Sequence, residues 1–386
     1  MARVSLSWAL ILGLLSGIGP LCTDFYLPAL PEITQQLQAT STQTQLSLTA
    51  ALIGLGLGQL FFGPLSDRIG RLKPLALSLL LFIFSSAMCA LTRDINMLIV
   101  WRFLQGFAGA GGSVLSRSIR DKYQGTLLTQ FFALLMTVNG IAPVLSPVLG
   151  GYVITAFDWR ILFWTMAAIG GVLLVMSLAI LRETRPATAA HASRQRPGQP
   201  VLKNRRFLRF CLIQAFMMAG LFSYIGSSSF VMQSEYGMSA MQFSLLFGLN
   251  GIGLIIAAMI FSRLARRFSA ESLLRGGLTL AVSCAAIMLL FAWLHLPVLA
   301  LVGLFFTVSL MSGISTVAGA EAMSAVDAAQ SGTASALMGT LMFVFGGIAA
   351  PLAGLGGETM LKMSLAMAIC YLLALLLGLS KPRDAR

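Results

Sequence analysis

Long apolar segments alternate with short polar segments along the whole chain. A membrane-spanning helix needs about 20 mostly apolar residues. By that measure the sequence predicts twelve spans, at residues 7–30, 43–62, 74–92, 97–116, 127–155, 160–181, 207–231, 242–262, 273–293, 297–319, 334–356 and 359–380. The segment at 127–155 is too long for one span, so we expect it to include some loop. The predicted fold class is an all-α integral membrane protein.

The basic residues predict the orientation of these spans. With the N-terminus placed inside, 22 of the 26 Lys and Arg residues lie in inner segments, three lie in outer loops and one lies within a span. Basic residues concentrate in the cytoplasmic loops of membrane proteins. Both termini are therefore expected in the cytoplasm.

The longest loop divides the predicted spans into six and six. Residues 182–206 are polar, basic and contain proline, which is typical of a linker. The sequence thus predicts an N-terminal half at 1–181, a cytoplasmic linker loop at 182–206, and a C-terminal half with a short tail at 207–386. A degenerate copy of the basic loop at 63–73 recurs at 262–267, which favours two related halves.

Composition excludes several classes of protein. Of the 386 residues, 57% are hydrophobic and 10% are charged, whereas a soluble protein carries about 25% charged residues. The net charge of +13 does not indicate nucleic-acid binding, because the basic residues lie in short loops between apolar segments. Five scattered cysteines and two distant histidines predict neither a disulfide framework nor a metal site, and no cofactor is expected.

Two charged residues lie within predicted spans. Asp24 is the one acidic residue inside a span, and Arg102 is the one basic residue there. A charge at the bilayer centre costs about 2.5–3.5 kcal/mol on insertion scales, so such residues usually have a function. Both are expected at a similar depth in the outer half, where Arg102 would keep Asp24 ionised. The alternative is that both lie at the membrane interface, with Arg102 extending toward water.

A short basic loop joins the second and third predicted spans. Its pattern Gly-x-x-x-Asp-Arg-x-Gly-Arg resembles the loop signature of the major facilitator superfamily. In that family the charged groups of this loop latch the two halves together. The resemblance therefore implies a conformational latch formed by Gly63, Asp67, Arg68, Gly70, Arg71 and Lys73. Leu72 departs from the family pattern, which usually has a second basic residue at that position.

Three further segments resemble the Bcr/CflA group of drug:proton antiporters within this superfamily: Thr23–Pro31, Arg102–Gly106 and Asn139–Gly151. The position of Asp24 within a span predicts that it is the proton site or a site for a cationic substrate. The resemblance implies that Arg102 couples transport to protons. It also implies an antiporter motif in the fifth span, formed by Gly140, Pro143, Pro147, Gly150 and Gly151. Two prolines in one helix remove hydrogen bonds and loosen it. A generic kinked helix without bearing on the direction of transport is the alternative.

In the second half, the segments around residues 222–233, 243–250 and 332–339 also resemble this group. Ile314–Thr316 departs from it, because a Pro-Asn pair is expected there. Polar and aromatic residues in the spans are candidates to line a substrate cavity: Tyr26, Gln105, Phe222, Tyr224 and Asn250. Ordinary packing or interfacial anchoring is the alternative for each of them.

The resemblance implies a bacterial inner-membrane transporter that exports small amphipathic drugs in exchange for protons. Its expected partners are a small-molecule substrate, protons and the lipid bilayer, with no nucleic acid, and a monomer is expected. A proton-coupled uptake transporter for nucleosides or other metabolites is the alternative. The sequence contains no phosphate-binding G-x-x-x-x-G-K-[ST] loop. It also offers no paired acid and base or catalytic triad, so no enzyme is predicted.

Overall fold

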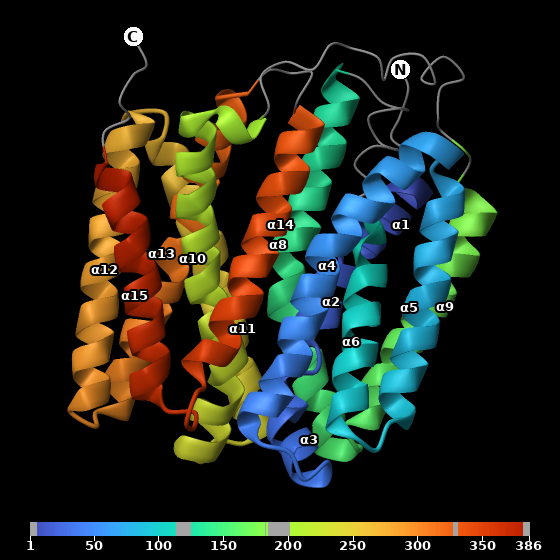
Figure 1. The fold of residues 1–386 in the computed structure, drawn as a ribbon, viewed down its shortest axis with the longest axis horizontal. Helices are drawn as coiled ribbons and strands as arrows, with labels where there is room; N and C mark the ends of the chain where they lie inside the picture. The colour runs from blue at the N-terminus through green and yellow to red at the C-terminus, as the bar shows by residue number, and fades with distance from the viewer. Residues whose placement is uncertain (1–5, 113–124, 182, 184–200, 327–330, 381–386) are drawn as a thin grey trace. The chain divides into compact units, whose positions relative to one another are not determined.

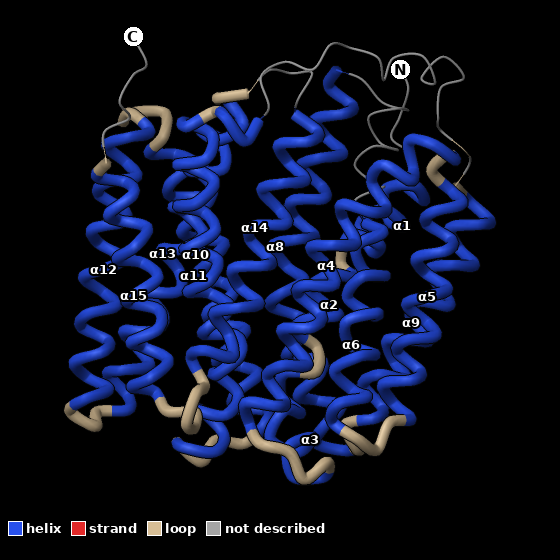
Figure 2. The backbone as a smooth tube through the Cα atoms, in the orientation of Figure 1, coloured by secondary structure: helices blue, strands red, loops and turns tan. Residues whose placement is uncertain are grey.

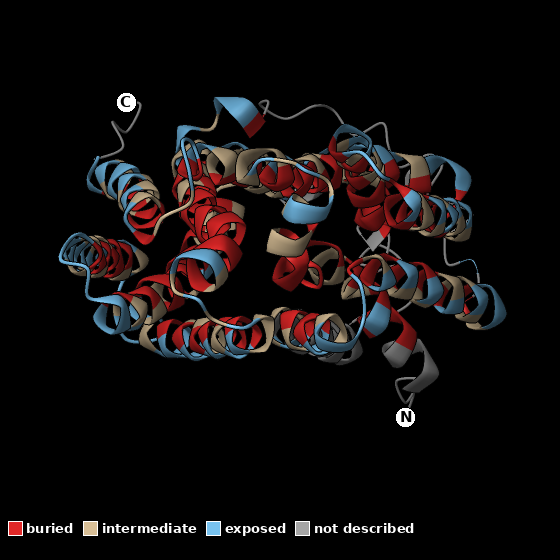
Figure 3. Cartoon of the chain, turned by 90° about the horizontal axis from the view of Figure 1, so that it is seen from below, coloured by how far each residue is buried: buried red, intermediate tan, exposed pale blue. Residues whose placement is uncertain are grey.

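The computed structural model describes residues 6–112, 125–181, 183, 201–326 and 331–380; side chains at 6–10, 67, 112, 125–140 and 331–332 are not described. Within these residues the structure is helical, with short connecting loops and no strand (Figure 2). The chain divides into two compact units, unit 1 (Met1–Gln195) and unit 2 (Arg196–Arg386). In each unit the buried residues lie on the helix faces that pack together, and many apolar side chains stay exposed on the other faces (Figure 3).

Unit 1 begins with a span that is broken into short pieces (Figure 1). Helix α1 ends at Ser16 and α2 begins at Ile18, so the break falls at Gly17. The described helices of this unit are α1 (Leu6–Ser16), α2 (Ile18–Asp24), η1 (Leu27–Ala29), α3 (Leu30–Gln36), α4 (Ser41–Ile69), α5 (Leu72–Leu91), α6 (Ile95–Gly109), η2 (Ala110–Gly112), α8 (Gly125–Ala156) and α9 (Arg160–Ile180).

Unit 2 has longer uninterrupted helices. Its first span, α10, continues into a short π-helix, η6, before the loop that leads to α11. The described helices of this unit are η5 (Val201–Lys203), α10 (Arg205–Phe230), η6 (Val231–Glu235), α11 (Ala240–Leu264), α12 (Ala270–Trp293), α13 (Pro297–Ser324), α14 (Ser331–Ala353) and α15 (Met360–Leu379).

Each predicted span coincides with a helix or a broken run of helices over its described residues; the end of the fourth span, 113–116, and most of the predicted linker at 182–206 lie outside them. In the described part of the chain, ten of the spans are long and apolar enough to cross a membrane, α6 has 15 residues, and α8 has 32 residues whose side chains are described only from Ile141 onward. Two expectations are wrong in detail. The long segment at 127–155 contains no loop, because α8 is one continuous helix. The basic loop at 63–73 is mostly helical, because α4 extends to Ile69 and α5 begins at Leu72.

Polar residues at the helix starts explain several boundaries. Thr40 caps α4 and Ser239 caps α11, each in a reciprocal capping box with a glutamine three residues later. Asp94 accepts a hydrogen bond from the backbone N–H of Met97 at the start of α6. These side chains satisfy backbone donors that a helix start leaves unpaired.

Glycines bring the helices that carry the buried charges close together. A Cβ placed on Gly106 of α6 would lie 2.0 Å from the backbone carbonyl oxygen of Ala51 in α4. A Cβ on Gly150 of α8 would lie 2.0 Å from the carbonyl oxygen of Phe25. Small residues permit such close packing of membrane helices. The segment around Asp24 is therefore packed directly against α8, while α6 is packed against α4.

Candidate functional site

Arg102 is the centre of a buried polar cluster in unit 1. It lies on α6, and its side chain is fully buried. Its Nη2 donates a 2.7 Å hydrogen bond to the carbonyl oxygen of Cys22 on α2, and its Nη1 lies 3.6 Å from the Cys22 sulfur. Nη1 also donates to Oε1 of Gln105, one turn along α6. Because Arg102 reaches a backbone carbonyl at the end of α2, it joins the first span to the fourth.

Aromatic rings cover the same guanidinium. The Arg102 Cζ lies 4.0 Å from the ring centroid of Tyr26 and 5.7 Å from that of Phe163. Ring faces stabilise a cation by about 0.5–2 kcal/mol, with the larger values in desolvated sites. The hydroxyl of Tyr26 forms a 3.3 Å hydrogen bond with that of Ser47 on α4, which fixes the ring. The predicted cavity residue Tyr26 therefore holds the buried cation.

Gln105 has a structural partner for each end of its amide. Its Oε1 accepts from Arg102, and its Nε2 donates to the Ser86 hydroxyl at 2.7 Å and contacts the Met166 sulfur at 3.2 Å. Gln105 is fully buried. In this structure it orients Arg102 between α5, α6 and α9, so its predicted contact with substrate stays a prediction.

Asp24 lies close to this cluster in sequence but is not part of it. It is the last residue of α2 and is 5% exposed. Within the described residues no ion pair or hydrogen bond joins Asp24 to Arg102, so the structure does not bring together the pair that we expected to interact. The guanidinium bonds instead to the carbonyl of Cys22, two residues earlier. The sequence could not indicate this, because any residue type supplies a backbone carbonyl.

The signature junction between α4 and α5 is a tight turn at Gly70. Gly70 has a φ of +96°, which favours glycine. The buried Arg71 donates from Nη1 to the Ser66 hydroxyl at 2.9 Å, and Ser66 donates to the carbonyl of Gly63. The other predicted latch residues include Arg68 and Lys73, which are both exposed, and Asp67, whose side chain lies outside the described residues.

Glu183 is a residue of this junction that the sequence analysis missed. Its two carboxylate oxygens each accept from the backbone N–H of Arg71 at 2.9 Å, and one also accepts from that of Leu72 at 3.2 Å. A carboxylate at a helix start satisfies free N–H groups and complements the helix dipole. The available signal was an isolated acidic residue directly after the sixth span, in an otherwise basic loop.

The predicted antiporter motif lies within α8. Pro143 and Pro147 are inside the helix, and Pro147 is buried. Gly150 faces the Phe25 carbonyl, and Gly151 lies next to it. The surroundings of Gly140 lie outside the described residues. Helix α8 therefore presents its closest contact to the backbone immediately after Asp24.

In unit 2 two of the predicted cavity residues, Tyr224 and Asn250, form a neutral cluster, while the third, Phe222, packs separately against α14. Asn250 on α11 donates a 2.9 Å hydrogen bond from Nδ2 to the hydroxyl of Tyr224 on α10. The Tyr224 ring stacks on Phe247 at 5.2 Å between centroids, and the Phe222 ring lies 6.1 Å from that of Phe343 on α14. Asn250 is 1% exposed, and its Oδ1 has no hydrogen-bond partner among the residues that the structure describes. That oxygen is a free acceptor for a donor group.

A polar cluster at the start of α9 ties it to the end of α3. Asp158 accepts from the backbone N–H of Arg160 at 2.9 Å and from Nε2 of Gln36 at 3.1 Å, and its ion pair with Arg160 measures 3.4 Å. Although partial burial acts to raise it, the pKa of Asp158 is lowered by these hydrogen bonds and by the Arg160 charge. The Trp159 indole donates to Gln36 at 2.9 Å.

No group of His, Cys, Asp and Glu in the described part of the chain is placed to hold a metal ion.

Comparisons with known proteins agree with this picture. The sequence profile of the Major Facilitator Superfamily matches residues 12–351. An uncharacterised MFS-type transporter of Bacillus subtilis, YdgK, is 37% identical over 98% of this chain and 96% of its own. A bicyclomycin resistance protein homolog of Haemophilus influenzae is 30% identical over 95% of this chain and 94% of its own.

Solved structures show the same fold. The xylose transporter XylE from E. coli, in a partially occluded inward-open conformation, superposes with a TM-score of 0.76 at 12% identity, over 98% of this chain and 99% of the other. The match to the bicyclomycin resistance homolog agrees with the resemblance to the Bcr/CflA group. With a profile match over most of its length and these relatives, the chain belongs to the Major Facilitator Superfamily and is a multi-pass membrane transport protein.

Proposed function

We propose that this protein is a proton-coupled antiporter that exports small amphipathic drugs by alternating access. The observation that carries the proposal is the pair of buried charges, Asp24 and Arg102, within the membrane-spanning part of unit 1. Buried ionisable groups in spans are expensive and mark ion or substrate pathways. The relative named for bicyclomycin resistance supports drugs as the substrate class.

Asp24 is assigned the role of proton carrier. Its carboxyl is buried at the end of a short helix, and no ion pair to Arg102 holds it in its charged form within the described residues. Taking up a proton removes a charge that the bilayer penalises. The inward proton gradient then drives export, with the voltage part worth about 2.3 kcal/mol per charge per 100 mV.

Arg102 is assigned the role of a fixed cation that responds to movement of the first span. Its bond to the Cys22 carbonyl ties it to the helix that ends at Asp24. A shift of α2 relative to α6 would therefore move this cation and Asp24 relative to one another. Such a change in the electrostatic surroundings of a carboxyl is a way to load and release a proton.

Substrate recognition is assigned to neutral groups of unit 2. The free Oδ1 of Asn250 and the aromatic rings of Tyr224 and Phe222 suit a flat amphipathic molecule that carries a hydrogen-bond donor. The proposed latch between conformations keeps the residues predicted for it: Gly63, Asp67, Arg68, Gly70, Arg71 and Lys73. Both termini are assigned to the cytoplasm because basic residues favour that side.

The test uses inside-out vesicles from cells that overproduce the protein. The vesicle interior is made acidic, candidate drugs are added singly, and proton release is followed with a pH-sensitive dye. Drug-dependent release is expected for the wild type and for Asp158→Asn, a matched change of a carboxyl outside the spans. It is expected to be absent for Asp24→Asn.

Equal release in Asp24→Asn would contradict the assignment of the proton to Asp24, while leaving antiport intact. The antiporter proposal fails if no drug elicits release and metabolite uptake into whole cells depends on the proton gradient. That result would favour a proton-coupled uptake transporter. Drug-dependent proton release and proton-dependent metabolite uptake thus decide between export and uptake.

A further inference from the structure

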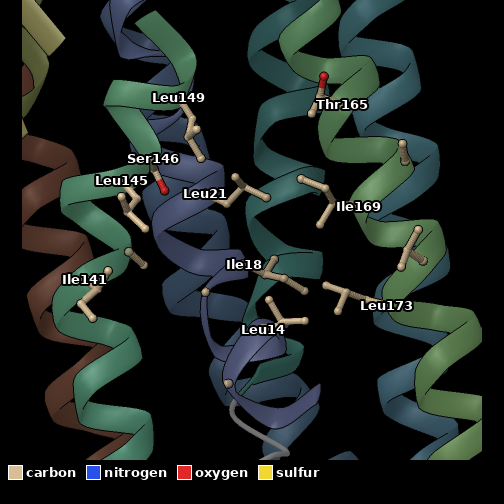
Figure 4. Close-up of a pocket in the computed structure, with 15 residues that line it drawn as sticks. Leu14, Ile18, Leu21, Ile141, Leu145, Ser146, Leu149, Thr165, Ile169 and Leu173 are labelled. Carbon is tan, nitrogen blue, oxygen red and sulfur yellow. The ribbon is translucent and has the colours of Figure 1, made fainter. Parts of the chain in front are cut away.

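A hollow of about 580 Å³ lies on the surface of unit 1, between α8 and α9 (Figure 4). Figure 4 shows α8 and α9 as the two walls, with α1 and α2 behind them as the floor. The side chains that shape it are Leu14, Ile18, Leu21, Leu145, Ile169 and Leu173. We call this hollow the α8–α9 groove. None of these residues belongs to the polar cluster around Arg102.

The chemistry of the groove is that of a hydrocarbon. No charged residue lines it, and the side-chain hydroxyls among its lining residues are those of Ser146 and Thr165. The Thr165 hydroxyl donates to the carbonyl of Ile161 in its own helix at 2.8 Å, so it is already satisfied. A ligand with several polar groups would lose hydrogen bonds to water there that two hydroxyls do not replace. The groove therefore favours a chain of methylene groups.

The groove opens on the surface that faces the bilayer. Its rim residues Leu14, Leu149 and Val172 are 52%, 54% and 59% exposed, and all three lie in spanning helices. Val175 and Leu178, further along α9, are also exposed. Because these apolar residues lie in a spanning helix, we expect this side of α9 to meet lipid.

We propose that the α8–α9 groove binds one acyl chain of a bilayer phospholipid. Acyl chains surround every spanning helix, so the occupant is present at high local concentration. A drug that must also satisfy polar groups meets only two hydroxyls among the residues that line this groove, those of Ser146 and Thr165. Burial of methylene groups in an apolar site is favourable relative to water. Relative to the bilayer the gain is smaller and comes from close packing in the hollow.

The position of the groove gives the bound chain a structural role. The floor is the broken first span, where Gly17 separates α1 from α2, and one wall is the segment of α8 that contains Pro143 and Pro147. Ile18 and Leu21 of α2 face the groove, while Cys22 of the same helix bonds to Arg102. A chain seated in the groove therefore braces the helix that holds the buried cation.

The first experiment maps lipid contacts directly. The full chain is reconstituted into vesicles of phosphatidylethanolamine and phosphatidylglycerol that contain a trace of phospholipid with a photoactivatable diazirine in one acyl chain. After illumination, labelled residues are located by mass spectrometry. Labelling of the groove residues is expected to exceed that of Val175 and Leu178 by about threefold or more, because an enclosed chain makes more contacts than one on an open face.

Two filling variants and one control sharpen the test. Ala168→Phe on α9 and Ala142→Phe on α8 place a ring in the groove from opposite walls. Each is expected to reduce groove labelling to about a third or less, because the filled hollow no longer encloses a chain. Val175→Phe adds the same ring to an open position of α9 and is expected to leave groove labelling unchanged.

Uniform labelling of all exposed apolar positions would overturn the proposal, and so would undiminished labelling in both filling variants. Loss of groove labelling on addition of a transported drug would assign the groove to drug rather than lipid. Cross-links between two copies of the chain at these residues would assign it to a dimer interface. All readouts are made on protein that elutes as a single species, and none of them depends on transport activity.

Discussion

The two units differ in the charge that they bury. Three charged residues are buried as whole residues in the part of the chain that the structure describes, and all three, Asp24, Arg71 and Arg102, belong to unit 1. In unit 2 Glu358 is only partly buried, although its carboxylate oxygens are shielded from solvent. The buried polar side chains described in unit 2 are neutral, such as Asn250 and the serines of α10: Ser223, Ser227, Ser228 and Ser229. The two units therefore carry different chemistry.

The first span of each unit shows the same contrast. In unit 1 it is broken at Gly17, and its second piece, α2, ends at Asp24. In unit 2 the corresponding span is continuous up to the π-helix η6 and presents hydroxyl groups. A buried charge is costly, whereas a buried hydroxyl can bond to its own helix. The free-energy cost of burying polar groups is therefore larger in unit 1. The division suggests that unit 1 couples transport to protons while unit 2 recognises substrate.

The largest effect is expected from neutralising the cation of unit 1. Arg102→Met removes hydrogen bonds to the Cys22 carbonyl and to Gln105. Bonds to a charged group are worth about 1.5–3 kcal/mol each. If both act in the coupled conformations, drug-dependent proton release falls about 100-fold or more, since each 1.4 kcal/mol is a factor of ten. The measurement is the initial rate in inside-out vesicles.

Arg102→Lys is the control for charge alone. A lysine keeps the positive charge but lacks the planar fork that reaches two acceptors. We expect it to restore little of the lost rate, and its melting temperature in detergent should fall below that of the wild type, because at least one buried acceptor loses its donor. Full activity in either variant would show that Arg102 has no role in coupling. It would contradict the proposal that unit 1 couples transport to protons.

Close helix contacts allow a second comparison of the units. Gly150→Ala places a Cβ 2.0 Å from the backbone carbonyl oxygen of Phe25, which cannot move without shifting the segment after Asp24. Gly346→Ala in unit 2 places a Cβ 2.1 Å from the Phe222 ring, which can rotate. Overpacking costs about 1–3 kcal/mol, so we expect Gly150→Ala near the upper end and Gly346→Ala near the lower.

Thermal unfolding of the purified protein measures both changes. Gly171→Ala is the matched control, because no atom lies within 4 Å of its added Cβ. Its melting temperature is expected to equal or slightly exceed that of the wild type, as alanine favours helix over glycine. Equal destabilisation by Gly150→Ala and Gly346→Ala would mean that α8 is no more tightly constrained than α14.

Helix positions were largely predictable from the sequence, because the membrane requires long apolar segments. Every predicted span coincides with a helix or a broken run of helices. The error at 127–155 arose because a length of one span was assumed, whereas α8 continues as one helix with Pro143 and Pro147 inside it. Membrane helices tolerate internal proline when neighbouring groups satisfy the freed backbone.

The contacts of the site were not predictable in the same way. Composition singled out Asp24 and Arg102, because a charge in an apolar segment is conspicuous. The partner of Arg102 depends on how α6 packs against α2, and a backbone carbonyl leaves no trace in the sequence. The α8–α9 groove is equally hidden, since a hollow arises from the spacing of three apolar segments that look alike as sequence.

A smaller effect is expected from the neutral cluster of unit 2. Tyr224→Phe leaves Nδ2 of Asn250 buried without its 2.9 Å acceptor, which costs about 1–3 kcal/mol. We expect the apparent KM for a transported drug to rise about tenfold, the equivalent of 1.4 kcal/mol. The number of protons released per drug is expected to stay the same.

Tyr152→Phe is the control, because Tyr152 is 69% exposed on α8 and loses its hydroxyl at an open surface. Drug flux and proton flux are measured together in the same vesicles. A changed proton-to-drug ratio in Tyr224→Phe would place part of the coupling in unit 2 and break the division between the units.

The smallest effect is expected at the start of α9, where Asp158 pairs with Arg160. Its pKa is lowered in the folded state by hydrogen bonds from Arg160 and Gln36 and by the Arg160 charge, against the opposing effect of partial burial. The stabilisation is therefore present near neutral pH and is lost as the pH falls through the lowered pKa. The Asp158 side chain is 41% exposed, so the contribution is at most about 1 kcal/mol. As the pH is lowered from 7, the melting temperature should fall less steeply for Asp158→Asn than for the wild type. Parallel curves would show that this exposed pair, unlike the buried charges of the same unit, contributes nothing to the free energy of unfolding.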